Sequence, residues 1–235
     1  MLEANSNAIW VIQSWGENST SGLLVGLDDV ENGKEHALIL DLWAEGVPNY
    51  KNGCPGNEAY GYAEEFDHTP WLFCMVNNFG GHLGLHGYLD NLVSRIPEAF
   101  NSCKKITGIS VMPEASENNP VLYDCFYECI WQDDASRKLP EINIENWLDE
   151  YSIRKYGKAS RAAQSAWDIL KETVYKAKFN DLGQGAPECV FTARPPVTIR
   201  AASAWGNAIV SYDKKELEKA AKLLLEDYDS LKESA

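Results

Sequence analysis

Four short runs of apolar residues divide the first half of the chain and predict four β-strands. They are IWVIQSW (Ile9–Trp15), ALILDLW (Ala37–Trp43), PWLFCMVNNFGG (Pro70–Gly81) and KITGISVM (Lys105–Met112). An amphipathic pattern at Leu89–Phe100 between the last two runs predicts a helix. The runs recur about every thirty residues, and parallel strands need a crossover of a dozen or more residues between them. The pattern therefore predicts an α/β region built on a parallel sheet.

The second half of the chain changes to helical spacing from about Pro140 onward. One apolar stripe ends at Gly157, and a second includes Ala163, Trp167 and Leu170. The last predicted helix begins at Asp213, which is followed three residues later by a glutamate, as in a capping box.

Four β/α units amount to half of an eight-stranded barrel. An open half-barrel leaves two strand edges unpaired, which favours association with another segment. The chain begins almost directly in a strand, with Trp10 and Val11. We therefore expect that an upstream part of the barrel is missing from this chain, or that the parent is split or truncated.

Composition excludes some classes of function. The hydrophobic fraction of 45% in 235 residues is enough for a sizeable core. The net charge of −14 argues against nucleic acid as a partner, because phosphate contacts need Lys and Arg. No run approaches the roughly 20 apolar residues of a membrane span, and no signal peptide is expected at the amino end. A secreted or lysosome-like parent stays open.

The six cysteines are too scattered for a zinc site and too few for a disulfide-dense scaffold. Cys125 and Cys129 lie four residues apart on a helical pattern, so both are expected to face the core. Buried free thiols are the expected state, and they mildly favour a reducing, cytoplasmic compartment over an oxidising one.

Glu114 is the candidate catalytic carboxylate. It follows the fourth predicted strand and precedes Asn119 and Pro120, which suit the N-cap and first position of a helix. The positive end of a helix dipole stabilises a nearby ionised carboxylate, as a nucleophile requires. A salt bridge or a capping role for Glu114 is the structural alternative.

The third run ends in two amides, an aromatic ring and two glycines. Asn78 and Phe79 suit a sugar, which offers hydroxyl pairs to an amide and an apolar face to a ring. Trp15, at the end of the first run, is a candidate to stack on the same ligand, although an isolated Trp is more often a core residue.

Two further acidic residues flank the second run. Asp41 lies inside a predicted buried strand and needs a partner, and a structural salt bridge is the expected one. Glu45 is a weaker candidate for the second carboxylate of a glycosidase pair.

Metal and cofactor chemistry finds little support in the sequence. His82 and His86 are four residues apart, but glycines in this segment disfavour the helix that would align them on a metal. Cys74 lies within an apolar run, which disfavours a Cys/His nucleophile pair. No nucleotide-binding glycine motif is present, so no metal and no cofactor is expected.

Taken together, these segments resemble the alpha-N-acetylglucosaminidase family, glycoside hydrolase family 89. The resemblance is colinear over essentially the whole chain. It rests most firmly on PWLFCMVNNFGGHLGLHG (Pro70–Gly87) and GISVMPEASENNPVLYD (Gly108–Asp124), and continues through WLDEYSIRKYG (Trp147–Gly157).

The resemblance implies a fold and an activity. Residues 1–138 are expected to form the C-terminal half of a (β/α)8 TIM-type catalytic barrel, and residues 139–235 the N-terminal part of an α-helical domain. The implied reaction releases terminal alpha-linked N-acetylglucosamine from glycans with retention of configuration. Glu114 matches the nucleophile in the family pattern, and Trp15, Leu42 and Phe79 resemble pocket residues.

The chain also departs from the family pattern. The general acid of the family lies upstream of the first run, and this chain has no such segment. A pocket histidine expected after the second helical stripe has no counterpart, because no histidine follows His86. Cys74 matches a cysteine of the pattern, which favours packing over catalysis.

These departures leave three readings of the chain open, of which the third is a scaffold or pseudogene product that neither binds nor turns over sugar. The first is a glycosidase that is incomplete without the upstream half of the barrel. The second is a catalytically inactive carbohydrate-binding fragment that uses Trp15, Asn78 and Phe79.

Overall fold

The structure is a computed structural model of the chain, and it describes residues 3–15, 20–51, 65–77, 85–114, 119–131, 139–176 and 212–232. The chain forms two compact units. The first comprises Met1–Val76 and Glu98–Pro113, and the second comprises Asn77–Pro97 and Glu114–Ala235. The domain boundary expected after residue 138 stays a prediction.

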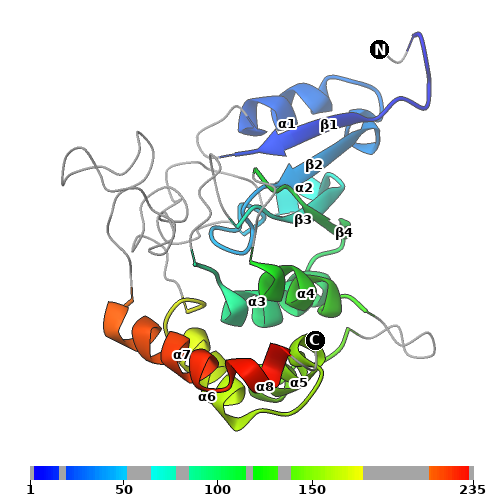
Figure 1. The fold of residues 1–235 in the computed structure, drawn as a ribbon. Coiled ribbons are helices and arrows are strands. Elements are labelled where there is room, and N and C mark those ends of the chain that lie inside the picture. Colours follow the sequence, from blue (N-terminus) through cyan, green and yellow to red (C-terminus); the bar gives the residue numbers. More distant parts are fainter. Residues whose placement is uncertain are drawn as a thin grey trace, which may run out of the picture. The chain divides into compact units, whose positions relative to one another are not determined.

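The first unit is built on a parallel sheet of four strands in the order β1-β2-β3-β4 (Figure 1). The strands are β1 (Trp10–Ser14), β2 (Ala37–Asp41), β3 (Trp71–Met75) and β4 (Ile106–Val111). Each lies inside one of the four apolar runs, so the predicted strands and their parallel arrangement are confirmed. The strands lie across the sheet in the same order as along the chain, because each crossover returns the chain to the position next to the previous strand.

The two outer strands of this sheet are β1 and β4. On β1, Trp10 is 47% exposed and Val11 is 52% exposed, whereas Ile12 and Ser14 are buried. Parallel strands are normally covered on both faces. The amino-terminal part of β1 therefore has apolar side chains that are open to solvent in the described part of the chain.

Short helical segments connect the strands of the first unit. They are α1 (Thr20–Asp28), the 3₁₀-helix η1 (Gly33–His36) and α2 (Glu65–His68). α2 is a single left-handed turn, since φ lies between 50° and 61° at all four of its residues. L-residues disfavour this conformation, and the burial of Phe66 at 0% exposure holds it in place.

The core of the first unit centres on Trp71 of β3, which is 0% exposed. Its indole stacks on Tyr50, with ring centroids 4.7 Å apart, and meets the edge of Phe66 at 5.8 Å. Tyr50 also contacts Phe73 at 6.4 Å. Aromatic side chains from β3 and from the segment between β2 and β3 thus fill the same space.

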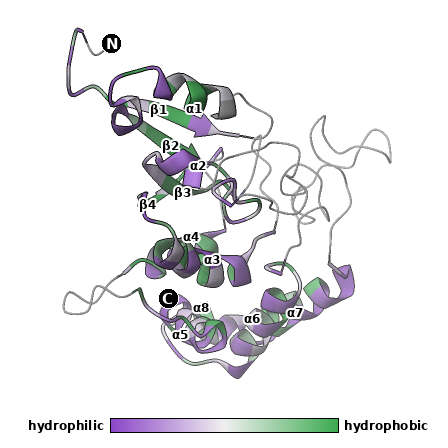
Figure 2. Ribbon diagram, turned by 180° about the vertical axis from the view of Figure 1, so that it is seen from behind, coloured by the Kyte–Doolittle hydropathy of each residue, from purple (hydrophilic) through white to green (hydrophobic). Residues whose placement is uncertain are grey.

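The second unit is helical. Its elements are α4 (Pro120–Glu128), α5 (Ile144–Tyr156), α6 (Arg161–Glu172), α7 (Lys214–Glu226), α8 (Tyr228–Lys232) and the first part of α3 (Leu89–Ser102). α6 packs against both α5 and α7. Figure 2 shows both hydrophilic and hydrophobic residues along α6 and α7, as expected for amphipathic helices. None of the helices in the described ranges is both long and apolar enough to cross a membrane.

A row of aromatic rings joins α5 to α6 and the turn after it. Trp147 stacks on Tyr151 at 5.3 Å, and Tyr151 meets the edge of Trp167 at 5.1 Å. Trp167 in turn lies 6.3 Å from Tyr175. The Tyr175 hydroxyl donates a hydrogen bond to Asn119 Oδ1 at 3.2 Å, which links the row to the start of α4.

Most of the residues that were predicted to begin or end a helix do so in the structure. Gly157 ends α5 in the left-handed conformation at φ 73°. Asp213 caps α7 by accepting a hydrogen bond from the Lys215 N–H at 2.8 Å. Asn119 occupies the N-cap position of α4 but makes no side-chain capping bond, because its side chain accepts from Tyr175 instead.

His86 gives the second unit a predictable acid sensitivity. It is 2% exposed, its ring meets the edge of Tyr88 at 5.0 Å, and burial lowers its pKa to about 4. Unfolding allows this histidine to take up a proton at a higher pH than the folded state does. The contribution of His86 to the free energy of unfolding is therefore fully present above pH 6.5 and is lost as the pH falls towards 4. We expect the loss between pH 7 and pH 4.5 to be about 2–3 kcal/mol greater in the wild type than in His86→Phe. Urea unfolding at the two pH values measures it.

His68, whose side chain is 70% exposed, supplies the control for this experiment. His68→Asn keeps a residue that tolerates the left-handed backbone and is expected to leave the acid loss as in the wild type. An unchanged acid loss in His86→Phe would contradict the role of burial at His86.

Candidate active site

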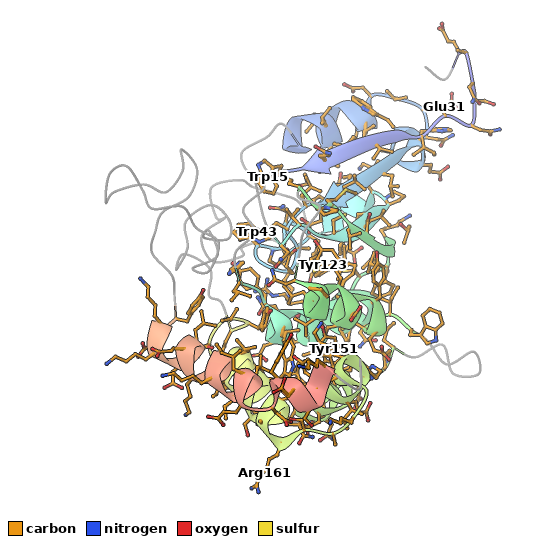
Figure 3. The ribbon with its side chains drawn as sticks, viewed as in Figure 1. Trp15, Glu31, Trp43, Tyr123, Tyr151 and Arg161 are labelled. Atoms are coloured by element: carbon orange, nitrogen blue, oxygen red, sulfur yellow. The ribbon has the colours of Figure 1, made fainter. Side chains whose placement is uncertain are left out.

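The candidate site residues follow the carboxyl ends of the strands. Trp15 comes directly after β1 and is 37% exposed, and Leu42 comes directly after β2 and is half-buried. Parallel pairing aligns Ser14 with Asp41, so both residues lie at the same edge of the sheet. Figure 3 shows Trp15 and Trp43 at this edge. Trp15 and Leu42 thus directly follow two adjacent strands, and their contact with a sugar stays a prediction.

Glu114 follows β4 by three residues. The Met112 N–H donates to the Met75 carbonyl at 2.9 Å, which continues the β3–β4 pairing one residue past β4. The Glu114 side chain is exposed, and α4 begins six residues later at Pro120, where a helix was predicted. Glu114 belongs to the second unit, whereas Trp15 and Leu42 belong to the first. The convergence of Glu114 with these two residues stays a prediction.

The predicted binding residues Asn78 and Phe79 lie outside the described residues. Their neighbour Asn77 is described: it is 1% exposed and adopts a φ of 62° directly after β3. The chain therefore turns sharply at the carboxyl end of β3, at the position from which the two predicted residues follow.

Asp41 is satisfied differently from the salt bridge that the sequence suggested. Its carboxylate is 0% exposed and accepts hydrogen bonds from the Asn49 N–H at 3.1 and 3.0 Å, from Asn49 Nδ2 at 2.9 Å and from the Tyr50 N–H at 3.0 Å. No ion pair to Asp41 exists among the described residues. Burial raises the pKa of Asp41 to about 7, although the N–H donors of Tyr50 and Asn49 oppose the shift.

Glu45 lies in the same loop and has a structural contact. It is 1% exposed, and its Oε1 accepts a hydrogen bond from the Val76 N–H at 3.1 Å. Cys74 of β3 is fully buried, and burial raises the pKa of its thiol, with Asp41 and Glu45 adding to the shift. A thiol whose thiolate is disfavoured is a poor nucleophile, which agrees with the packing role predicted for Cys74.

Two hollows in the described part of the helical unit are not lined by any of the predicted site residues. One of about 490 Å³ is lined by Asp124, Tyr127, Glu128, Trp131 and Arg154. Within the described ranges, no three His, Cys, Asp or Glu side chains gather as a metal site would require. His86 is described and buried beside Tyr88, and His82 lies outside the described residues.

Sequence reasoning missed the partners of Asp41. Asn49 and Tyr50 were not recognised as donors, because they follow the strand by eight and nine residues and no periodic pattern connects them. An acidic residue at a strand end followed by a loop rich in Gly, Pro and Asn is the one available signal.

Comparisons with known proteins agree with this arrangement. Residues 1–133 match the alpha-N-acetylglucosaminidase tim-barrel domain, and residues 147–235 match the alpha-N-acetylglucosaminidase C-terminal domain. The chain is 29% identical over 239 residues to human alpha-N-acetylglucosaminidase. That match covers 98% of this chain but only 29% of the human protein.

Solved structures of a family 89 glycoside hydrolase from Clostridium perfringens are also similar. The complex with PUGNAc is 35% identical with a TM-score of 0.81, and covers 99% of this chain and 24% of the bacterial one. A form with two Glu-to-Gln substitutions, in complex with its substrate GlcNAc-alpha-1,4-galactose, is 33% identical with a TM-score of 0.79 and the same coverage. The parallel sheet and the helices thus correspond to part of a TIM barrel and part of a helical domain, and the chain belongs to the alpha-N-acetylglucosaminidase family of glycoside hydrolases.

Proposed function

We propose that this chain is part of a retaining glycosidase that releases terminal alpha-linked N-acetylglucosamine from glycans. The observation that carries the proposal is the position of Glu114 just after β4, in a parallel sheet whose residues match the barrel domain of the family. Catalytic residues of β/α barrels come from the carboxyl ends of the strands.

This chain is proposed to form one part of a larger enzyme. Residues 1–138 are the C-terminal half of the barrel, and residues 139–235 are the N-terminal part of the helical domain. The sheet of four strands supports this, because each of its outer strands, β1 and β4, pairs with only one other strand among the described residues. The chain spans 24% to 29% of the length of the relatives described above.

The chemistry follows from one carboxylate on each side of the scissile bond. The Glu114 carboxylate attacks the anomeric carbon, the bond to the leaving oxygen breaks, and a general acid protonates that oxygen. A water molecule, deprotonated by the same group, then attacks the anomeric carbon and frees Glu114. The substrate-bound relative carries two Glu-to-Gln substitutions, which fits a mechanism with two glutamates.

The general acid is proposed to come from a segment outside residues 1–235. In retaining enzymes the two carboxyl groups lie about 5–5.5 Å apart. Glu45 is a poor candidate for this acid, because it is buried and accepts a hydrogen bond from the Val76 N–H. Residues 1–235 alone therefore hold one of the two carboxylates, and turnover is expected from the full-length protein.

Four residues are proposed to hold the sugar. Trp15 and Phe79 offer rings to the apolar face of N-acetylglucosamine, Leu42 offers an apolar contact, and Asn78 offers an amide to the hydroxyl groups. The exposure of Trp15 after β1 supports its part, because 37% of its surface is open to a ligand.

Neutral glycan ends are the proposed substrates. A chain with a net charge of −14 repels sulfated polysaccharides at long range, so mucin-type ends are favoured over heparan-type chains. The neutral disaccharide bound by the bacterial relative fits the same preference.

The stereochemistry of the first product tests the proposal. We expect the full-length protein to hydrolyse an aryl alpha-N-acetylglucosaminide and to release the alpha anomer first, as a double displacement requires. Proton NMR during the first minutes of the reaction distinguishes the two anomers before mutarotation.

The matching aryl beta-glycoside is the control and is expected to remain intact. Release of the beta anomer first would overturn the retaining mechanism. Binding of N-acetylglucosamine without any turnover by the full-length protein would favour the inactive carbohydrate-binding role instead.

A further inference from the structure

The loop after β2 contains two buried carboxylates that the proposed reaction does not use. Asp41 is 0% exposed and Glu45 is 1% exposed, and between them lies Leu42, the proposed apolar contact to the sugar. A buried carboxylate is costly unless it is well hydrogen-bonded, and apolar replacements are often as stable. These two carboxylates are hydrogen-bonded within the loop and to the segment after β3, so their bonds decide the path of the loop.

Asp41 closes this loop on itself. Both of its oxygens accept from the Asn49 main chain, and Tyr50 and the Asn49 side chain add further bonds of 3.0 and 2.9 Å. The chain leaves the sheet after Asp41 and returns to the same carboxylate eight residues later. The distance between the two ends of the loop is thereby fixed by one side chain.

Other bonds fix the loop to its two neighbouring strands. The Leu42 N–H donates to the Ser14 carbonyl of β1 at 3.2 Å, and the Ala44 N–H donates to the Cys74 carbonyl of β3 at 3.0 Å. Glu45 Oε1 adds its bond from the Val76 N–H directly after β3. Leu42 is thus attached to β1 on one side, and the residues after it are attached to β3 on the other.

The backbone inside the loop has a conformation that needs this support. Trp43 adopts a φ of 62°, which L-residues disfavour, and its ring lies against Gly46, where an added Cβ would come within 2.3 Å of the indole. The Gly46 and Val47 N–H groups both donate to the Trp43 carbonyl, at 2.9 and 2.8 Å. This tight turn begins directly after Leu42, so the path of the chain at Leu42 depends on the closure of the loop.

We propose that Asp41 is a positioning residue that holds Leu42 against the bound sugar by closing the loop between residues 41 and 50. The inference rests on the proposed function, since it takes Leu42 as a contact to N-acetylglucosamine. Asp41 itself does not touch the substrate. Glu45 supports the same loop through its bond to the end of β3.

A double-mutant cycle on the full-length protein tests this. The probe is 2-acetamido-1,2-dideoxynojirimycin, and its Kd is measured by calorimetry for the wild type, Asp41→Asn, Leu42→Ala and the double variant. We expect each single variant to weaken binding about tenfold, the size of one lost apolar pocket contact. We expect the double variant to be little weaker than Leu42→Ala, because Asp41 acts through Leu42.

Steady-state kinetics provide a second measurement, which a purely structural role of Asp41 would not change. In Asp41→Asn, KM for an aryl alpha-N-acetylglucosaminide is expected to rise about tenfold with kcat within about threefold, the pattern of lost uniform binding. Glu65→Gln is the matched control: Glu65 is 6% exposed and accepts a bond from the Lys104 N–H at 2.7 Å, at the opposite, amino-terminal edge of the sheet. The Glu65→Gln variant is expected to lower the stability of the protein without changing the Kd for 2-acetamido-1,2-dideoxynojirimycin.

The outcomes separate this inference from the proposed function. Absence of binding in the wild type, or no effect of Leu42→Ala, would overturn the proposed pocket. Normal binding by Asp41→Asn, or losses that add fully in the double variant, would overturn the role of Asp41 alone. Where Asp41→Asn does not fold, Asn49→Ala takes its place in the cycle, because it removes a single donor of 2.9 Å.

Discussion

Replacing Glu114 by glutamine should lower kcat/KM for an aryl alpha-N-acetylglucosaminide by at least about 10⁴-fold, or about 5 kcal/mol of transition-state stabilisation. Glutamine has the same shape as glutamate, but its amide does not form the glycosyl ester of a double displacement. The side chain is exposed after β4, so the change should leave the fold and the thermal unfolding temperature as they are. Steady-state kinetics and a thermal melt on the full-length protein measure both.

Two controls make this result specific to Glu114. Glu141→Gln changes another exposed glutamate of the same unit and should keep wild-type activity. In Glu114→Ala, added azide should restore turnover of an activated aryl substrate and give a beta-linked glycosyl azide, because azide attacks from the face that the carboxylate has vacated. Wild-type rates in Glu114→Gln would refute the assignment of the nucleophile.

The largest loss of stability is expected from Trp71→Ala. Trp71 is 0% exposed, stacks on Tyr50 at 4.7 Å and meets Phe66 at 5.8 Å, so the change leaves a cavity in the centre of the first unit. Large-to-small changes at buried aromatic residues cost about 3–5 kcal/mol. Urea unfolding followed by far-UV circular dichroism, which does not depend on the lost indole, measures the free energy of unfolding.

Trp131→Ala is the matched control for this prediction. Trp131 is 78% exposed, so its removal should change the free energy of unfolding by less than about 0.5 kcal/mol. Equal losses from the two variants would mean that Trp71 does not pack as the structure describes.

The two central strands, β2 and β3, were the most predictable, because burial on both faces gives parallel strands continuous apolar runs. Ile39, Leu40, Phe73 and Cys74 are all buried within strands that the sequence predicted. The left-handed turn at Glu65–His68 was not predictable. It contains no glycine or asparagine, and tertiary packing of Phe66 outweighs the local preference there.

Local capping signals were predictable only where no tertiary contact competed for the side chain. Gly157 ends its helix as the sequence indicated, because glycine adopts positive φ at little cost. Asn119 was predicted from the same kind of signal, yet its side chain bonds Tyr175, which lies 56 residues away. Such a long-range partner leaves no trace in the sequence around Asn119.

For the candidate site, the placement of Trp15 and Leu42 after strands was predictable, whereas the hydrogen bonds that support the loop after β2 were not. Trp15 and Leu42 could be placed at strand ends because the apolar runs end there. The need of Asp41 for a partner was also evident from its place in a buried strand. The identity of that partner was not evident from the sequence. Every residue except proline has a main-chain N–H, so the donors cannot be recognised by residue type. Only the path of the loop brings Asn49 and Tyr50 back to the carboxylate.

The closed loop after β2 has a consequence for how this part of the chain tolerates change. Three of the four bonds to Asp41 come from main-chain N–H groups, which every residue except proline provides. Exchanging side chains along this loop should therefore matter less than inserting or deleting a residue within it. Loop grafts or library designs at this position need to conserve the number of residues between the strand and its returning amides, and also the glycine at position 46, where a Cβ would come within 2.3 Å of the Trp43 indole.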